Sequence, residues 1–316
     1  MSARVPRYVY GPVPSRRLGR SLGIDLVPFK TCSYDCVYCQ LGRTTYQTAT
    51  PEEHAPVAAI LEELAGTLRR GPHPDFIGLA GSGEPTLHAR IGELIAGIKR
   101  LTSLPVAVLT NGSLLWRPEV RAGLARADLV MPSLDAGCPR VFERVNRPHR
   151  DIPFERMVDG LVAFAAGFAG QIWLEVFVLR GITDRPAESG RIAAIAKQIR
   201  PARVQLNTVS RPPAEADARP ASTASLERLR RRFQGRCEVI AGERPATPGG
   251  AAAGRDAGGE ILALVSRRPC TVDGIATGLG LAPNEVLKHL DGLCATGAVR
   301  SSRSRRGSFY HRGGRP

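Results

Sequence analysis

The stretch Lys30-Thr-Cys-Ser-Tyr-Asp-Cys-Val-Tyr-Cys-Gln-Leu-Gly42 places three cysteines, Cys32, Cys36 and Cys39, on one short loop. Thiolates are soft ligands that select zinc or iron-sulfur clusters, and one loop carrying three of them can wrap a corner of a metal centre. A structural zinc site takes four protein ligands, commonly from two paired motifs, and no second Cys-x-x-Cys occurs in this chain. We therefore interpret the stretch as an iron-sulfur loop that leaves one metal position open. A structural zinc or a disulfide knot is the alternative.

The sequence before the cysteines predicts where this loop sits. Residues 8–20 are rich in Gly and Pro and predict an ordered loop leading into the core. Residues 21–28 alternate well enough for a strand. The cysteines therefore follow the carboxyl end of a strand, which is where α/β folds place their chemistry.

Beyond the cysteines the pattern alternates between helix and strand. Thr50-Pro-Glu-Glu53 predicts a helix start, with Thr50 as N-cap and Glu53 completing a capping box. Strands are predicted at 21–28, 76–80, 106–109, 129–133, 172–179 and 204–209, and helices at 50–70, 88–101, 118–125, 153–166, 187–199 and 222–234. Six strand-helix units predict a parallel sheet with helices outside, and six are too few for a closed eight-stranded barrel.

A composition change near residue 243 predicts a domain boundary. Residues 243–259 carry almost nothing that could fill a core, so we predict a flexible linker there. Residues 260–316 then predict three helices, at 260–267, 272–278 and 283–295, and a hairpin over 298–312 with a basic tip. This order resembles a winged-helix domain. The predicted organisation is an N-terminal loop segment (1–20), an α/β core (21–242), a linker (243–259) and a winged-helix-like domain (260–316).

Polar residues gather at the predicted strand ends. Gly81-Ser-Gly-Glu84 directly follows the second core strand, and such glycines let the backbone approach a ligand closely while a carboxylate can pair with an ammonium group. Later strand ends carry Asn111, Ser133, Asp135, Glu175 and Asn207. Asn and Asp are also common in turns, so turn capping is an alternative role for Asn111 and Asp135.

The spacing Cys-x3-Cys-x2-Cys, with aromatic Tyr38 before the last cysteine, closely resembles the signature of radical S-adenosylmethionine (SAM) enzymes. The resemblance implies an open (β/α)6 partial barrel in which Cys32, Cys36 and Cys39 hold a 4Fe-4S cluster whose unique iron chelates SAM. Gly81, Ser82, Gly83 and Glu84 resemble the Gly-Gly-Glu motif that holds the amino group of SAM, with Ser82 replacing the second glycine. It further implies SAM contacts for Ser133 and Asp135 and pocket lining by Asn111 and Glu175.

The run Tyr10 to Asp25, joined to the cysteine loop, resembles stand-alone Fe-S oxidoreductases related to the wyosine-base synthases of tRNA. This resemblance spans residues 8–240. Two features of those synthases are missing from the sequence: a flavodoxin-like domain and a second three-cysteine motif. Electrons are therefore expected from a separate, acidic flavodoxin or ferredoxin, and a second cluster is not expected.

The net charge of +15 concentrates polyanions near the surface, which makes nucleic acid, tRNA or DNA, the leading macromolecular partner. An arginine excess can also reflect genomic base composition. In the C-terminal domain the candidate contacts are Arg303, Arg305 and Arg306 at the hairpin tip and Asn284, Glu285, Lys288 and His289 on the recognition-helix face. No apolar run suits a membrane span or a secretory signal, so we expect a cytoplasmic protein.

Three functions follow from these observations. The first is a SAM-cleaving enzyme that abstracts hydrogen from an unidentified substrate, with RNA as one candidate. The second is an iron-sulfur redox sensor whose winged helix binds DNA. The third is a peptide-modifying radical SAM enzyme whose winged helix docks the peptide. The sequence contains no G-x-x-x-x-G-K-[ST], G-x-S-x-G or H-E-x-x-H signature of other enzyme classes.

Overall fold

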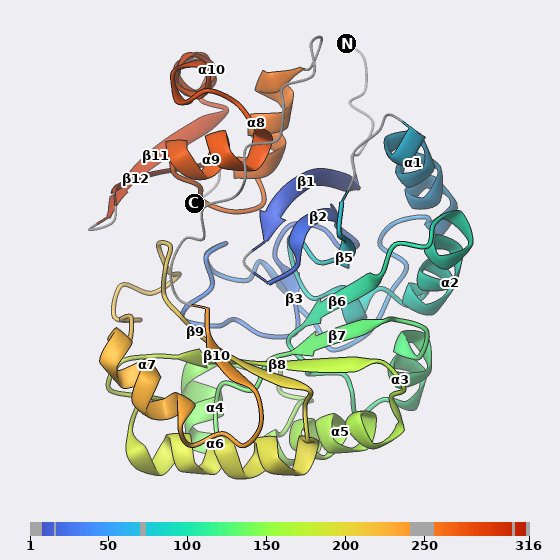
Figure 1. Cartoon of the computed structure of the whole chain (residues 1–316), viewed down its shortest axis with the longest axis vertical. Coiled ribbons are helices and arrows are strands. Elements are labelled where there is room, and N and C mark those ends of the chain that lie inside the picture. The colour runs from blue at the N-terminus through green and yellow to red at the C-terminus, as the bar shows by residue number, and fades with distance from the viewer. Residues whose placement is uncertain (1–7, 16, 70–73, 241–255, 305–306, 314–316) are drawn as a thin grey trace.

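An eight-stranded sheet forms the centre of the protein (Figure 1). The computed structural model describes residues 8–15, 17–69, 74–240, 256–304 and 307–313. The strand order is β1-β2-β5-β6-β7-β8-β9-β10, and every neighbouring pair is parallel except β1 and β2. The strands are β1 (Val9–Ser15), β2 (Gly19–Ile24), β5 (Phe76–Leu79), β6 (Val106–Thr110), β7 (Leu129–Pro132), β8 (Gln171–Val178), β9 (Arg203–Thr208) and β10 (Cys237–Val239).

Helices cover the outer face of this curved sheet (Figure 1). They are α1 (Val57–Arg69), α2 (Ile91–Leu101), α3 (Pro118–Leu124), α4 (Pro139–Val145), α5 (Phe154–Gly167), α6 (Pro186–Ile199) and α7 (Thr223–Arg230). The predicted partial barrel with six strand-helix units is confirmed, with β10 as an added parallel strand and α4 as an unpredicted helix. Strand residues such as Leu22, Ile77 and Val108 are fully buried, as expected for a parallel sheet covered on both faces.

The prediction of a loop over residues 8–20 was wrong. Residues 9–15 form β1, which pairs antiparallel with β2 around an irregularity between Tyr10 and Val13. Pro12 and Pro14 are tolerated because β1 is an edge strand that need not donate a full ladder of hydrogen bonds. In the turn that follows, Leu18 packs against Met131, Trp173 and other residues inside the barrel. This segment therefore contributes to the barrel itself.

The predicted helix start at Thr50 was also wrong, because α1 begins at Val57. Residues before it are extended: Glu52 donates its backbone N–H to the Leu87 carbonyl at 2.8 Å and accepts from the Ala89 N–H at 3.0 Å. This pairing satisfies the backbone groups that a helix would otherwise use. The first helical bond then runs from Ile60 N to Pro56 O, so tertiary pairing overrides the capping signal.

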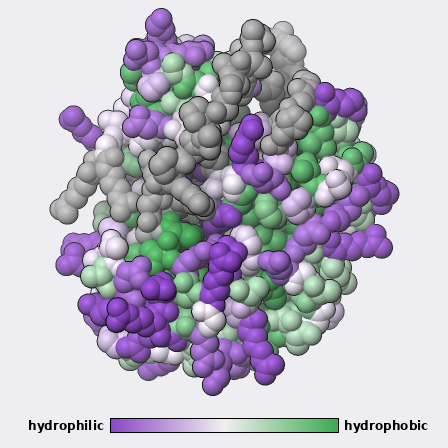
Figure 2. Space-filling model, viewed as in Figure 1, coloured by the Kyte–Doolittle hydropathy of each residue, from purple (hydrophilic) through white to green (hydrophobic). Residues whose placement is uncertain are grey.

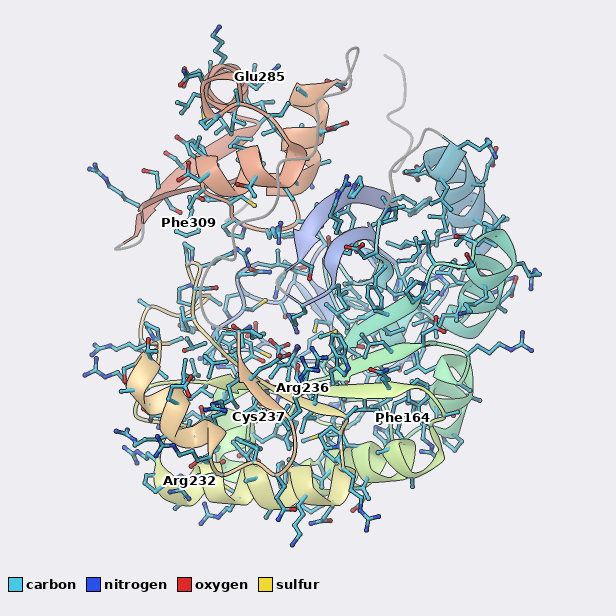
Figure 3. All side chains as sticks on the ribbon, viewed as in Figure 1. Phe164, Arg232, Arg236, Cys237, Glu285 and Phe309 are labelled. Carbon is cyan, nitrogen blue, oxygen red and sulfur yellow. The ribbon has the colours of Figure 1, made fainter. Side chains whose placement is uncertain are left out.

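The chain ends in three helices and a hairpin, as the sequence predicts. They are α8 (Ala257–Val265), α9 (Val272–Leu279), α10 (Pro283–Ala295), β11 (Val299–Ser304) and β12 (Gly307–Arg312). We call residues 257–313 the C-terminal unit; Figure 3 labels Glu285 on α10 and Phe309 on β12. The linker prediction reached too far, since residues 257–259 begin α8, capped by the Asp256 side chain on Gly259 N. Residues 243–255 of that linker, and Arg305 and Arg306, lie outside the described residues.

The C-terminal unit packs on β1 (Figure 1). Val13 of β1 belongs to the same hydrophobic cluster as Ile261, Leu264 and Ile275 of α8 and α9. This contact covers the edge of the sheet, which would otherwise present unpaired backbone groups.

Hydrophilic side chains cover much of the molecular surface in Figure 2, including the end of the molecule where α7 lies. Exposed Arg228, Arg230 and Arg231 contribute there. Among the helices of the described residues, none combines the length and the apolar character needed to cross a bilayer.

Candidate active site

The cysteine loop lies at the carboxyl end of β2, as predicted, and is fixed by backbone pairing on two sides. Thr31 and Cys32 form the short strand β3 (Thr31–Cys32), which pairs in parallel with β4 (Tyr46–Gln47). On the other side, Val37 N donates to Val145 O at 2.9 Å and His149 N donates to Ser33 O at 2.8 Å. The loop is thus held as part of a small backbone network before any cofactor binds.

Each cysteine sulfur has a different hydrogen-bond donor near it. Lys30 Nζ lies 3.2 Å from Cys39 Sγ, and Asn111 Nδ2 lies 3.6 Å from Cys32 Sγ. A third donor, Asn146 Nδ2, lies 3.6 Å from Cys36 Sγ. Lys30 and Asn146 were not predicted as site residues. The buried Lys30 stood in the quoted stretch but has no motif role, and Asn146 follows a helix that the sequence pattern did not reveal.

Burial favours the protonated form of two of the three thiols, Cys32 and Cys36. Burial, with a smaller contribution from the nearby Glu84 carboxylate, raises the pKa of Cys32 to about 12. Burial and the neighbouring Cys32 raise the pKa of Cys36 well above its ordinary value. Because a metal ligand must be a thiolate, cluster assembly on this loop has to release protons.

The three sulfurs and their donors fit a 4Fe-4S cluster, whose cysteines each ligate a different iron. Three thiols, each near an N–H donor that can stabilise ligand sulfur, fit the cluster.

The turn of residues 81–84 packs directly on the cysteine loop. Lys30 N donates to Ser82 O at 2.7 Å, and Glu84 N donates to Thr31 O at 3.1 Å. Gly83 lies so close that a Cβ there would overlap the Thr31 carbonyl. The two motifs, more than forty residues apart in sequence, therefore form one continuous surface.

The Glu84 carboxylate is buried at the centre of this surface. Oε1 accepts from Thr86 N at 3.0 Å, Thr86 Oγ1 at 2.6 Å and Thr110 Oγ1 at 2.5 Å, whereas Oε2 accepts from Asn111 N at 2.7 Å. Burial raises the pKa of Glu84, and these donors oppose that rise. A carboxylate oxygen can accept more than one hydrogen bond, so Oε2 has capacity for a cationic ligand.

Tyr38 and Asp135 meet on the other side of the loop. The Tyr38 hydroxyl donates to Asp135, and its ring stacks on Phe177 with centroids 3.9 Å apart. Asp135 also accepts from Asn146 Nδ2 at 2.8 Å and Phe177 N at 3.0 Å. Burial raises the pKa of Asp135 to about 6. In this arrangement Asp135 holds Tyr38 and the Asn146 that contacts Cys36.

Ser133, the residue directly after β7, forms a parallel bridge with Glu175 of β8. The Glu175 carboxylate binds Arg17 at 2.8 Å and accepts from Asn207 Nδ2 at 2.8 Å. Arg17 comes from the turn between β1 and β2, a segment to which the sequence assigned no site residue. The structure thus brings the cysteines, Asn111 and residues 81–84 together, and pairs Glu175 with Arg17.

Comparison with known proteins fits this geometry. Residues 26–189 match the radical SAM superfamily, a range that contains the cysteine loop, the 81–84 turn and Glu175. The chain belongs to the radical SAM superfamily. It is therefore an enzyme of the radical SAM class, and its cofactors are a 4Fe-4S cluster and SAM.

Relatives of this radical SAM protein carry different names. It is 36% identical over 299 residues to a UPF0026 protein of Helicobacter pylori, covering 93% of this chain and 94% of the relative. It is 39% identical over 294 residues to a Brachyspira hyodysenteriae protein named GTPase Obg; these cover 92% of this chain but only 43% of that protein. A UPF0026 protein of Methanocaldococcus jannaschii is 36% identical over 214 residues, with 67% of this chain and 66% of the relative covered.

Solved structures share the fold. A radical SAM methyltransferase from Sphaerobacter thermophilus superposes with a TM-score of 0.52 at 18% identity, covering 71% of this chain and 67% of that chain. Streptococcus suis SuiB, solved with its precursor peptide SuiA, gives a TM-score of 0.50 at 15% identity over 71% of this chain and 50% of that chain. At these identities the likeness concerns the fold alone.

Proposed function

We propose that this radical SAM enzyme uses Cys32, Cys36 and Cys39 to hold the cluster and Glu84 to hold the amino group of SAM. When bound, the cluster would supply the single electron needed for reductive cleavage of SAM to methionine and a 5′-deoxyadenosyl radical, the species that would abstract hydrogen from the substrate. Asn111 links the two halves of the site, because its N–H binds Glu84 and its side chain reaches Cys32 Sγ. The single observation that carries the proposal is the direct packing of residues 81–84 on the cysteine loop.

The test is anaerobic reconstitution with iron and sulfide, followed by dithionite and SAM. We expect 5′-deoxyadenosine from the wild type and little or none from Glu84→Gln, with iron content unchanged in that variant. Glu53→Gln, which alters an exposed carboxylate paired with Arg90, is the control and should behave as the wild type. A reconstituted protein that binds DNA in a cluster-dependent way but forms no 5′-deoxyadenosine would refute the proposal in favour of a redox sensor.

An acidic flavodoxin or ferredoxin is the proposed electron donor. A pocket of about 550 Å³ beside the cysteine loop is lined by Arg43, Arg147 and Arg150, by the carboxylates Asp35 and Glu143, and by the apolar Phe142 side chain. Arg147 directly follows Asn146, whose side chain lies 3.6 Å from Cys36 Sγ. Arg43 and Arg147 are paired with Asp35 and Glu215, whereas the Arg150 side chain is 91% exposed. Arg150 is therefore the cation that an acidic partner could contact here. Arg150→Glu should slow flavodoxin-driven turnover several-fold and leave dithionite-driven turnover unchanged. If the variant and the wild type turn over at the same rate with flavodoxin, this docking site is excluded.

RNA is the proposed substrate class, supported by the net charge and the C-terminal hairpin. Exposed Arg300, Arg303 and Arg312 lie on β11 and β12. The exposed face of α10 is less favourable to phosphate, because Glu285 and Asp291 accompany Lys288. Arg303→Gln should therefore weaken RNA binding and reduce its salt dependence, whereas Lys288→Gln should change little. If both variants bind RNA as strongly as the wild type does, the hairpin is not the RNA-binding surface.

A further inference from the structure

Asp25 is a mostly buried carboxylate that the functions above do not use. It directly follows β2 and accepts two hydrogen bonds from the SAM-binding turn, from Ser82 N at 2.9 Å and Ser82 Oγ at 2.5 Å. Its side chain is 13% exposed. Burial raises the pKa of Asp25, and the two bonds from Ser82 oppose that rise.

The backbone of the same turn lies against this carboxylate. A Cβ added to Gly81 would lie 2.5 Å from Asp25 Cγ, and Gly81 has a left-handed φ of +157°. Gly81 and Ser82, the first two residues of the turn, therefore both lie in contact with the Asp25 carboxylate. Glu84, which follows two residues later, depends on the same turn for its position.

The C-terminal unit reaches the other side of Asp25. Arg267, just after α8, places Nε 3.6 Å from Asp25 Oδ2, and its guanidinium lies over the Tyr10 ring at 4.4 Å from the centroid. Arg267 is itself fixed by a 2.9 Å bond from Nη1 to Ala263 O within α8. Tyr10 in turn donates its hydroxyl to Ala80 O at 3.2 Å, at the residue before the turn.

Arg267 and its carboxylate partner are shielded from water, since both side chains are 13% exposed. An ion pair in such a site is screened less than a surface pair. Removing the guanidinium leaves a buried carboxylate with fewer compensating partners, and the turn that binds this carboxylate must then adjust. A movement of α8 therefore acts on the turn through a short, continuous set of contacts.

We propose that Asp25 and Arg267 are positioning residues of the SAM site, and that docking of the C-terminal unit on β1 is thermodynamically coupled to SAM binding. This inference rests on the proposed role of residues 81–84. Coupling is reciprocal, so SAM should stabilise α8 by the same factor by which docked α8 strengthens SAM binding. The contact of Arg267 with Asp25 is the link through which both effects pass.

The experiment measures two quantities on the reconstituted holoenzyme. The first is the Kd for SAM by equilibrium dialysis, and the second is hydrogen–deuterium exchange of the α8 amides with and without SAM. In the wild type, SAM should slow exchange in residues 260–267. Arg267→Met should raise the Kd about tenfold, equivalent to about 1.4 kcal/mol, and abolish the response of α8. Arg267→Lys, which keeps the charge, should restore part of both.

Asp291→Asn is the matched control, because it removes an exposed charge from α10 of the same unit. It should bind SAM and protect α8 as the wild type does. Wild-type protein that binds SAM with no change in α8 exchange, or Arg267→Met protein with wild-type affinity, would overturn the coupling while leaving the proposed function intact. If wild-type protein binds no SAM at all, the proposed function fails and this inference with it. Circular dichroism of each variant separates these results from misfolding.

Discussion

Gly83 lies where the turn of residues 81–84 is in direct contact with the cysteine loop, and Gly83→Ala tests whether that contact holds the site together. The new Cβ would overlap the Thr31 carbonyl oxygen and lie 2.8 Å from both the Thr31 carbonyl carbon and Val27 Cγ2. Two of these atoms are backbone, so the clash cannot be relieved by rotating a side chain. Relief requires the two segments to separate, which breaks the 3.1 Å bond from Glu84 N to Thr31 O.

The expected loss of stability follows from two contributions. Overpacking of a rigid contact costs about 1–3 kcal/mol, and loss of one backbone hydrogen bond costs about 1 kcal/mol. Gly83→Ala should therefore lower the free energy of unfolding of the metal-free protein by about 2–4 kcal/mol, as measured by urea denaturation followed by circular dichroism. After reconstitution the variant should also retain less iron per chain, because the displaced segment carries Cys32.

Gly167→Ala supplies the control for this measurement. Gly167 is the last residue of α5, has no left-handed φ, and would place its Cβ more than 4 Å from neighbouring atoms. Alanine there should leave stability unchanged or raise it by up to about 1 kcal/mol. If Gly83→Ala unfolds at the same urea concentration as Gly167→Ala and binds a full complement of iron, the proposed contact between the two motifs is not what organises the site.

Three further predictions concern the electrostatics of the site and the burial of thiols. Lys30→Met should lower the midpoint potential of the cluster, measured by redox titration with electron paramagnetic resonance, by on the order of 60 mV, because the ammonium that stabilises the reduced state is lost; an unchanged potential would refute this. Thr110→Val removes a hydrogen-bond donor that lowers the pKa of Glu84, so the pKa of Glu84 should rise further in this variant. When the pH is lowered, the variant should therefore lose SAM affinity at a higher pH than the wild type does. Thr110→Ser keeps the hydroxyl and should follow the wild type. Burial raises the pKa of Cys237 to about 12, so iodoacetamide at pH 8 should label it at least ~100-fold more slowly than exposed Cys294; similar rates by mass spectrometry would contradict the structure.

Cys237 lies on β10, the edge strand of the sheet, next to Arg236 (Figure 3). This strand was not predicted from the sequence. It is only three residues long and therefore lacks the alternation that identified the longer strands.

The six parallel strands were predictable because each carries a buried apolar run followed by turn residues. Local signals failed where tertiary pairing competed with them. Thr50 has the chemistry of an N-cap, yet the backbone of Glu52 forms a parallel bridge with His88. The helix therefore begins only at Val57. The Gly- and Pro-rich segment before β2 forms strand β1, because an edge strand tolerates proline.

The cysteines, Asn111 and Glu84 could be predicted as neighbours because parallel strands bring their carboxyl ends to one edge. Lys30, Asn146 and Arg17 could not, since each acts through a contact that no local spacing encodes. Arg17 is the clearest example: it is separated from Glu175 by most of the barrel sequence, and only the turn between β1 and β2 brings them together.

Ser82 is the one position where the turn departs from the Gly-Gly-Glu pattern, and Asp25 explains the departure. A carboxylate that is only 13% exposed needs donors, and Ser82 supplies two of them, its N–H and its hydroxyl. Glycine at position 82 would keep the first donor and lose the second, leaving Asp25 with a larger uncompensated desolvation cost. The Ser82 side chain therefore compensates the Asp25 carboxylate at the end of β2. The departure from the Gly-Gly-Glu pattern is thus compatible with the proposed role of the turn in holding SAM. It follows that Asp25 and Ser82 should be exchanged together, as a pair, in any variant that seeks to preserve this site.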